Sequence, residues 1–339
     1  MIKKYALLLF LLSFYLHASN ASKVLISDKK VLAQVSRFFE KKIKKEIIFD
    51  TQKKYLLTQK NVEAYNNIAY YLNEENIEGV ETMLHSIIKA FPKRAVTYYT
   101  LADFYSKHSK ISKMREAYIN YIWQMSRQNK VHIVPKKVAK ELKELYPIIK
   151  DLRRKYDYLS FIKFGDLNKD SVDDLILFVE SKKGKTKLLV YIYDTKLNRY
   201  TLVETNEYLP PSYATIKSQN QVNVKEDEME DFYFLSNIHL DKLLILSFSQ
   251  ANYHTVFRGI DNKYKFQYRN KKMKLIGAEL LNYSRTRGNG IQESINYLSG
   301  KKEIYSVVDV HTKKGKSKWR KLQEKKLLNL EEFRYEDVY

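Results

Sequence analysis

The chain contains no cysteine among its 339 residues. This absence excludes a disulfide framework, thiolate zinc sites, a cysteine nucleophile and a lipoprotein anchor. Glycine and proline are also scarce, at nine and five residues, which argues against a collagen-like or loop-rich body. Without disulfides, the fold must be stabilised by its hydrophobic core and by any ion that it binds.

The common catalytic motifs are missing as well. The six histidines after residue 21 are scattered, without an HExxH pattern, and no GxSxG, P-loop or Rossmann fingerprint occurs. Nothing in the residues requires an enzyme, and we predict a non-catalytic protein. Two alternatives stay open. One is a hydrolase of envelope glycans that uses β-domain carboxylates, such as Glu279 and Glu293, as acid and base. The other is an immunity-like inhibitor of a secreted toxin.

The N-terminus has the pattern of a secretory signal. Lys3 and Lys4 precede an uncharged apolar run over 5–16, and the small residues Ser19 and Ala21 suit cleavage before Ser22. The apolar run is shorter than the ~20 residues that span a bilayer. We therefore predict a signal peptide over 1–21, no transmembrane segment in the cleaved chain, and a periplasmic or secreted bacterial protein.

Acidic residues are outnumbered, 39 against 61 basic ones, and the formal net charge is +22. Such a balance favours anionic partners, although general lysine enrichment has the same effect. The basic residues are spread along the chain, and an exported protein rarely meets nucleic acid. The predicted partner is an envelope protein or an anionic wall polymer, and not a nucleic acid.

Aromatic residues make up 14% of the chain and include 28 tyrosines, a composition typical of a folded globular protein. The length allows two domains. Helical periodicity dominates residues 22–150, and Ile68-Ala69 recurs 33 residues later as Leu101-Ala102, with Pro92 between the two. This spacing resembles degenerate tetratricopeptide (TPR) repeats. The resemblance implies stacked helix pairs, either with a concave peptide-binding surface or as a helical domain without a groove in use.

Beyond Pro147 to Arg154 the period changes from helical to alternating, which predicts an antiparallel β domain over 151–310. The expected architecture is α+β, with the β domain a sandwich, a curled sheet or a partial propeller. Residues 311–339 form a predicted basic C-terminal tail. The expected strands are 158–164, 175–179, 188–193, 199–204, 231–235, 242–248, 255–259, 263–269, 273–281, 290–297 and 303–310.

Residues 164–175, here called the acidic loop, carry the densest set of oxygen side chains. Asp166, Asn168 and Asp170 alternate along the loop, Asp174 follows, and the carbonyl of Val172 can add a further oxygen. Calcium prefers six to eight oxygen ligands from carboxylates, amides and carbonyls. The loop therefore predicts a structural Ca²⁺ site. The alternative is an Asx-rich turn whose side chains cap their own backbone.

The acidic loop is not an EF-hand, since Ser171 and Leu177 occupy positions that need Gly and a bidentate Glu. The order Phe-Gly-Asp-Leu-Asn-x-Asp-x-x-Asp-Asp-Leu resembles the FG-GAP calcium loop of integrin-type propeller repeats and VCBS-like exported proteins. The resemblance covers about twelve residues and implies an ion at Asp166, Asn168, Asp170 and Asp174. Ser171 departs from the glycine of that pattern, which predicts a strained turn. Together these features predict an exported binding or scaffold protein with one structural calcium ion.

Overall fold

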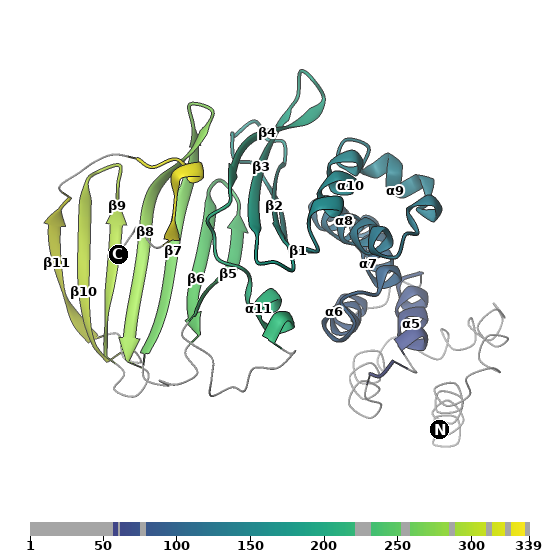
Figure 1. Ribbon diagram of the computed structural model, residues 1–339, viewed down its shortest axis with the longest axis horizontal. Coiled ribbons are helices and arrows are strands. Elements are labelled where there is room, and N and C mark those ends of the chain that lie inside the picture. The colour runs from purple at the N-terminus through teal and green to yellow at the C-terminus, as the bar shows by residue number, and fades with distance from the viewer. Residues whose placement is uncertain are drawn as a thin grey trace. The chain divides into compact units, whose positions relative to one another are not determined.

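The computed structural model describes residues 57–59, 62–74, 79–220, 232–251, 258–284, 289–309, 314–322 and 327–335. The chain divides into a helical unit that ends at Leu142 and a second unit that begins at Lys143 (Figure 1). The predicted α+β class, with helices before antiparallel sheets, is confirmed. The predicted signal peptide lies outside the described residues. Within the described ranges, no helix has both the length and the hydropathy needed to cross a membrane.

The helical unit is built from helices that pack in sequence order. Its described elements are α5 (Val62–Glu74), α6 (Val80–Ala90), α7 (Ala95–Lys107), α8 (Ile111–Arg127), the 3₁₀ helix η1 (Val131–Ile133) and α9 (Lys136–Glu141). Helix α5 contacts α6 and α7, and α7 packs along α8. Ala69 and Ala102 are fully buried, and Asn66 Nδ2 donates a hydrogen bond of 3.3 Å to Thr100 Oγ1 across α5 and α7. Small side chains at these two positions allow close helix approach.

A charged network joins α6 to the two helices that follow it. The Glu81 carboxylate accepts hydrogen bonds from Tyr105 Oη at 2.9 Å, Lys110 Nζ at 3.0 Å and Lys113 Nζ at 3.3 Å. Burial alone would raise the pKa of Glu81, but these three donors outweigh it and hold the pKa at about 2. Glu81 is therefore ionised at neutral pH and links α6 to α7 and α8.

The second unit opens with α10 (Tyr146–Lys155) and continues as two antiparallel meanders. The four-stranded sheet has the order β1-β2-β3-β4, and the seven-stranded sheet has the order β11-β10-β9-β8-β7-β6-β5 (Figure 1). The elements are β1 (Tyr158–Gly165), β2 (Asp174–Glu180), β3 (Thr186–Asp194), β4 (Arg199–Asn206), α11 (Tyr213–Asn220), β5 (Phe232–Leu240), β6 (Leu244–Ala251), β7 (Arg258–Arg269), β8 (Lys272–Ser284), β9 (Gly290–Asn296), β10 (Lys301–Asp309), β11 (Lys314–Lys321) and the 3₁₀ helix η3 (Leu330–Glu332).

The two sheets contribute side chains to one hydrophobic core, which the C-terminal segment completes. Phe333 is fully buried, and its ring centroid lies 4.8 Å from that of Tyr264 and 5.3 Å from that of Phe266. Asn206 Nδ2 in β4 donates to the carbonyls of Leu330 and Phe333 at 2.5 and 2.7 Å. The fully buried members of this core are Ile176, Phe178, Leu188, Val190, Leu235, Leu244, Leu246, Phe266, Met273, Leu330 and Phe333. Residues 327–335 therefore belong to the packed core.

The structure differs from the sequence-based prediction at three places. The unit boundary precedes Lys143, and residues 146–155 form α10. The predicted strands at 255–259 and 263–269 are, where described, parts of one strand, β7, because Asp261 and Asn262 pair within the ladder instead of turning. The predicted basic tail contains β11 and the core segment 327–335. Both faces of β11 are exposed, so it lacks the apolar alternation that signals a strand.

Candidate functional site

The acidic loop connects β1 to β2, and its side chains bind the loop backbone. Asp166 accepts hydrogen bonds from the N–H groups of Asp170, at 3.0 Å, and Ser171, at 2.9 Å. Asn168 Oδ1 accepts from the same Asp170 N–H at 3.1 Å, so it converges with Asp166 Oδ1 on one amide. Asn168 Nδ2 donates to Asp170 Oδ2 at 2.9 Å. These contacts bring three of the predicted ligands, at positions 166, 168 and 170, into one network.

Asp174 has a different environment, because it is fully buried at the start of β2. Its Oδ2 accepts from the N–H groups of Leu167 and Asn168 at 2.8 and 3.3 Å, and its Oδ1 accepts from Tyr193 N–H in β3 at 2.9 Å. Burial raises the pKa of Asp174 to about 6, although the three backbone donors lower it. Asp174 therefore anchors the loop backbone to β3, and none of these three hydrogen bonds joins it to the side chains at 166, 168 and 170.

The chemistry of this loop suits a hard cation. Carboxylates, an amide oxygen and the Val172 carbonyl are the ligand types that calcium takes. Ser171 has a φ of 68°, in the left-handed region that favours glycine, as the predicted strain at this position requires. In the described part of the chain, no group of three or more His, Cys, Asp or Glu side chains is arranged to hold a metal ion. As placed, the loop side chains satisfy backbone N–H groups, which is also the arrangement of an Asx-rich turn.

Glu279 and Glu293, the example of a catalytic pair, do not come together. Glu279 lies opposite Ser294 and its neighbour Leu280 lies opposite Glu293, so the two carboxylates point to opposite faces of the sheet. Each also forms an ion pair of 2.5 Å, Glu279 with Lys265 and Glu293 with Lys302. They cannot flank one glycosidic bond.

Comparison with protein families, curated proteins and solved structures found no match for this chain.

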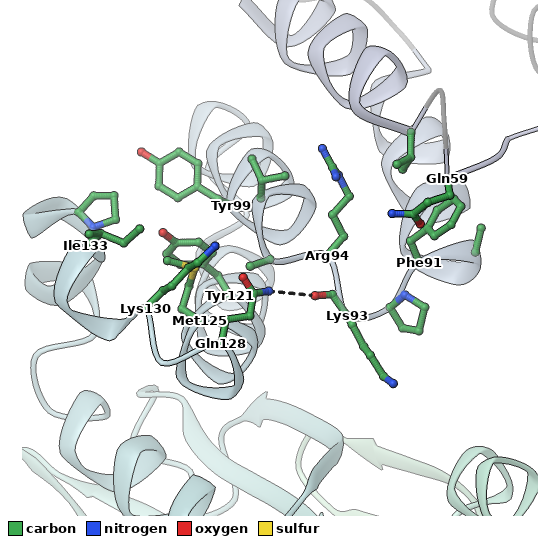
Figure 2. Close-up of a pocket in the computed structure, with 16 residues that line it drawn as sticks. Gln59, Phe91, Lys93, Arg94, Tyr99, Tyr121, Met125, Gln128, Lys130 and Ile133 are labelled. Atoms are coloured by element: carbon green, nitrogen blue, oxygen red, sulfur yellow. Dashed lines mark hydrogen bonds between the residues drawn. The ribbon is translucent and has the colours of Figure 1, made fainter. Parts of the chain in front are cut away.

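A second candidate site is a groove of about 820 Å³ on the helical unit, at the turn between α6 and α7 (Figure 2). Aromatic rings of Phe91, Tyr99 and Tyr121 line it, and Ile133, whose exposed fraction is 57%, lies at its η1 side. Gln128 Nε2 donates to the Lys93 carbonyl at 3.4 Å and so joins the end of α8 to this turn. The groove is mainly apolar and open to solvent.

The charged residues that line the groove are all basic: Lys93, Arg94 and Lys130, with no acidic residue among the lining side chains. Figure 2 shows the Arg94 side chain extending between Tyr99 on one side and Phe91 on the other. Arg94 Nε is buried and has no hydrogen-bond partner within the described ranges. Burial lowers the pKa of Arg94, and the nearby Glu63 raises it. Arg94 is therefore a partly desolvated cation whose buried Nε–H has no partner among the described residues.

Helix α7 adds to this positive region. Arg94 immediately precedes the helix, and its first turn receives no hydrogen bond from a capping side chain. The helix N-terminus carries a partial positive charge from its aligned peptide dipoles. A carboxylate that enters the groove beside Arg94 would meet both the guanidinium and this helix end.

This groove was not predicted from the sequence. There, Pro92 served only to separate the two recurring segments. The available signal was the pair Lys93-Arg94 directly after Phe91-Pro92, a doubly basic turn between two helices. Lys130 and Ile133 come from a different loop, and only the packing of α7 against α8 brings them near that turn.

Proposed function

We propose that this chain is an exported, non-catalytic binding protein of the bacterial envelope, and that its TPR-like helical unit binds a partner in the groove beside Arg94. The observation that carries the proposal is the lining of the groove: three cations, aromatic and aliphatic side chains, and no acid among the described lining residues. The signal-like N-terminus supports export.

The occupant that fits this lining is an extended peptide segment with a carboxylate next to apolar side chains. The guanidinium of Arg94, a residue that lines the groove, supplies directional donors, because a guanidinium binds a carboxylate in a planar fork. The rings of Tyr99 and Tyr121 lie close to each other in the lining of the groove. Together they offer an apolar surface. The groove volume falls in the range of pockets that bind small ligands or a few side chains.

Removal of a groove cation should weaken this binding. We expect a fluorescein-labelled peptide with Glu beside Leu and Phe to bind about tenfold or more weakly to Arg94→Ala and to Lys130→Glu, because each loses a charge-assisted contact worth about 1.5–3 kcal/mol. Lys140→Glu is the matched control, since Lys140 is exposed on α9, outside the groove lining, and the charge change is the same as in Lys130→Glu. Fluorescence anisotropy measures the affinities.

A second peptide, with Gln in place of Glu, tests the role of the carboxylate. Equal affinity for the two peptides, or unchanged affinity in both groove variants, would contradict the proposal. Binding of a soluble anionic glycan that depends on Arg94, without binding of the peptide, would identify a wall polymer as the partner instead.

We further propose that the acidic loop binds one calcium ion that stiffens the β domain. Asp166, Asn168, Asp170 and the Val172 carbonyl would hold it, with Asp174 as the anchor from β2. The convergence of Asp166 and Asn168 oxygens on one amide supports this assignment. The ion would neutralise the negative charges of the acidic-loop carboxylates, which lie close together in the sequence.

Calcium should raise the stability of the protein. At a concentration 100 times its Kd, a ligand specific for the folded state adds about 2.7 kcal/mol. We expect this gain to be lost in Asp170→Asn, which removes one charge from the exposed part of the loop, and kept in Asp151→Asn, a similar change on α10. Thermal melts in calcium, magnesium and EDTA provide the measurement. Superimposable melts of the unmodified protein in all three conditions would exclude the site.

A further inference from the structure

Strand β11 is an edge of the seven-stranded sheet, and on its outer side no strand pairs with it in the described part of the chain. The order of the seven-stranded sheet places β11 at one end and β5 at the other. The β5 edge is covered, because Leu235 N–H donates to the Pro211 carbonyl at 3.0 Å. In the four-stranded sheet, β1 contacts β5 and β4 contacts η3. β11 pairs with β10 alone.

The backbone groups on this open edge can be assigned from one hydrogen bond. Leu322 N–H donates to the Gly300 carbonyl at 2.9 Å, next to the β10–β11 ladder and in the same register. Hydrogen-bonded pairs alternate along an antiparallel ladder. Arg320, Lys318 and Lys316 therefore bond to β10. The N–H and C=O groups of Ser317 and Trp319 point away from β10, toward the open edge.

The side chains of β11 carry one sign of charge. Five of its eight residues are Lys or Arg and none is acidic. Lys316, Lys318 and Arg320 share one face, since side chains alternate along a strand. The β10 residues opposite them, Ser306, Ile304 and Lys302, include no acid. On the other face, Trp319 exposes 62% of its surface.

This charge pattern selects against a second copy of the chain. Two antiparallel β11 strands would place cations beside cations, and like charges on paired strands are destabilising. Lysine on an edge strand is one means by which proteins avoid edge-to-edge association. A partner strand with acidic residues would instead be attracted, because each acid would lie beside a cation that has no acidic neighbour on β10.

We propose that β11 accepts an extended acidic segment of another protein as an additional strand. Glu or Asp side chains would lie opposite Lys316, Lys318 and Arg320. Apolar or β-branched residues between them would lie opposite Ser317 and pack on Trp319. Backbone hydrogen bonds to Ser317 and Trp319 contribute affinity that does not depend on the sequence of the partner. The basic side chains make binding selective for acidic segments. The surface belongs to the second unit and does not depend on the groove of the helical unit.

The test uses the purified protein and a short synthetic peptide in which Glu alternates with Val or Thr. Trp319 is an internal reporter, because the other tryptophan, Trp123, has an exposed fraction of 1%. We expect the peptide to shift the fluorescence of Trp319 to shorter wavelength. We also expect it to bind at least tenfold more tightly than a peptide in which Pro replaces each Val or Thr and every Glu is kept. The two peptides carry equal charge, but the second cannot form the ladder.

Two protein variants separate the backbone contribution from the charge contribution. Ser317→Pro removes an N–H that points outward and leaves the ladder to β10 intact. Lys318→Glu reverses one charge at the centre of the basic face. Each should weaken peptide binding at least tenfold, while Lys183→Glu, in the exposed turn between β2 and β3, should leave it unchanged.

Three outcomes overturn the proposal. The peptide fails to bind, or the Pro-containing peptide binds as tightly as the alternating one. In the third outcome, polyglutamate or anionic phospholipid vesicles bind with the affinity of the peptide, which indicates adsorption by charge alone. If Ser317→Pro does not fold, as judged by circular dichroism, the comparison of the two peptides on the unmodified protein and the Lys318→Glu variant still decides the result.

Discussion

Replacement of Phe333 by alanine should lower the free energy of unfolding of the second unit by about 3–5 kcal/mol. The phenylalanine ring is fully buried between the sheets, within 6.3 Å centroid distance of Phe248 and closer to Tyr264 and Phe266. Truncation removes this contact and leaves a cavity that the strands on either side cannot close. Urea unfolding, followed by the circular dichroism signal of β-sheet, measures this loss of stability.

The control for Phe333 is Trp319→Ala. Trp319 is a larger aromatic residue, but 62% of its surface is exposed, so its removal should change the free energy of unfolding by about 0.5 kcal/mol or less. Equal effects of the two substitutions would mean that residues 327–335 do not pack in the core. Truncation of the chain before Leu330 should reproduce the Phe333→Ala loss or exceed it.

Replacement of Asp174 by alanine should cost at least about 3 kcal/mol, because it leaves three buried or half-buried backbone N–H groups without an acceptor. These donors belong to Leu167, Asn168 and Tyr193, so both the acidic loop and β3 lose their anchor. The loss should persist in EDTA, since it arises from the backbone and not from a bound ion. Urea unfolding with and without calcium measures it.

Two further variants place the Asp174 result in context. Asp174→Asn keeps one acceptor oxygen but turns an N–H₂ group toward a backbone donor, so its loss should be smaller but still measurable. Asp166→Asn keeps its loop contact at one oxygen and lies at a half-buried position, whereas Asp174 is fully buried, so in EDTA it should cost less than Asp174→Ala. If Asp174→Ala is destabilising only when calcium is present, the anchoring role of Asp174 is wrong.

The α+β class was predictable because the period of the hydrophobic pattern changes along the chain. Ala69 and Ala102, the small residues of the recurring segments, are both fully buried. Most strand ranges were predicted within a few residues, since buried and half-buried residues alternate over the first part of β8 and apolar residues form a near-continuous short run over β3. Strand β2 was predicted although all seven of its residues are buried, because its apolar run is short and β-branched.

The groove and the C-terminal segment were not predictable by the same reasoning. Lys93, Arg94 and Lys130 are ordinary surface residues in the sequence, and only the packing of α7 on α8 places them around one hollow. Phe333 stands among charged neighbours, and its burial depends on Asn206, more than a hundred residues earlier, which binds the carbonyls of Leu330 and Phe333. Contacts between distant segments leave no local pattern.

The amino-acid sequence by itself determined the order of helices and strands and the position of the acidic loop, because both depend on residues close together in the chain. Only the tertiary structure decided which cations share a groove, which face of the sheet each carboxylate occupies, and which strand is left as an open edge. Those properties follow from how the elements pack and pair, and the free energy of packing depends on residues from every part of each unit.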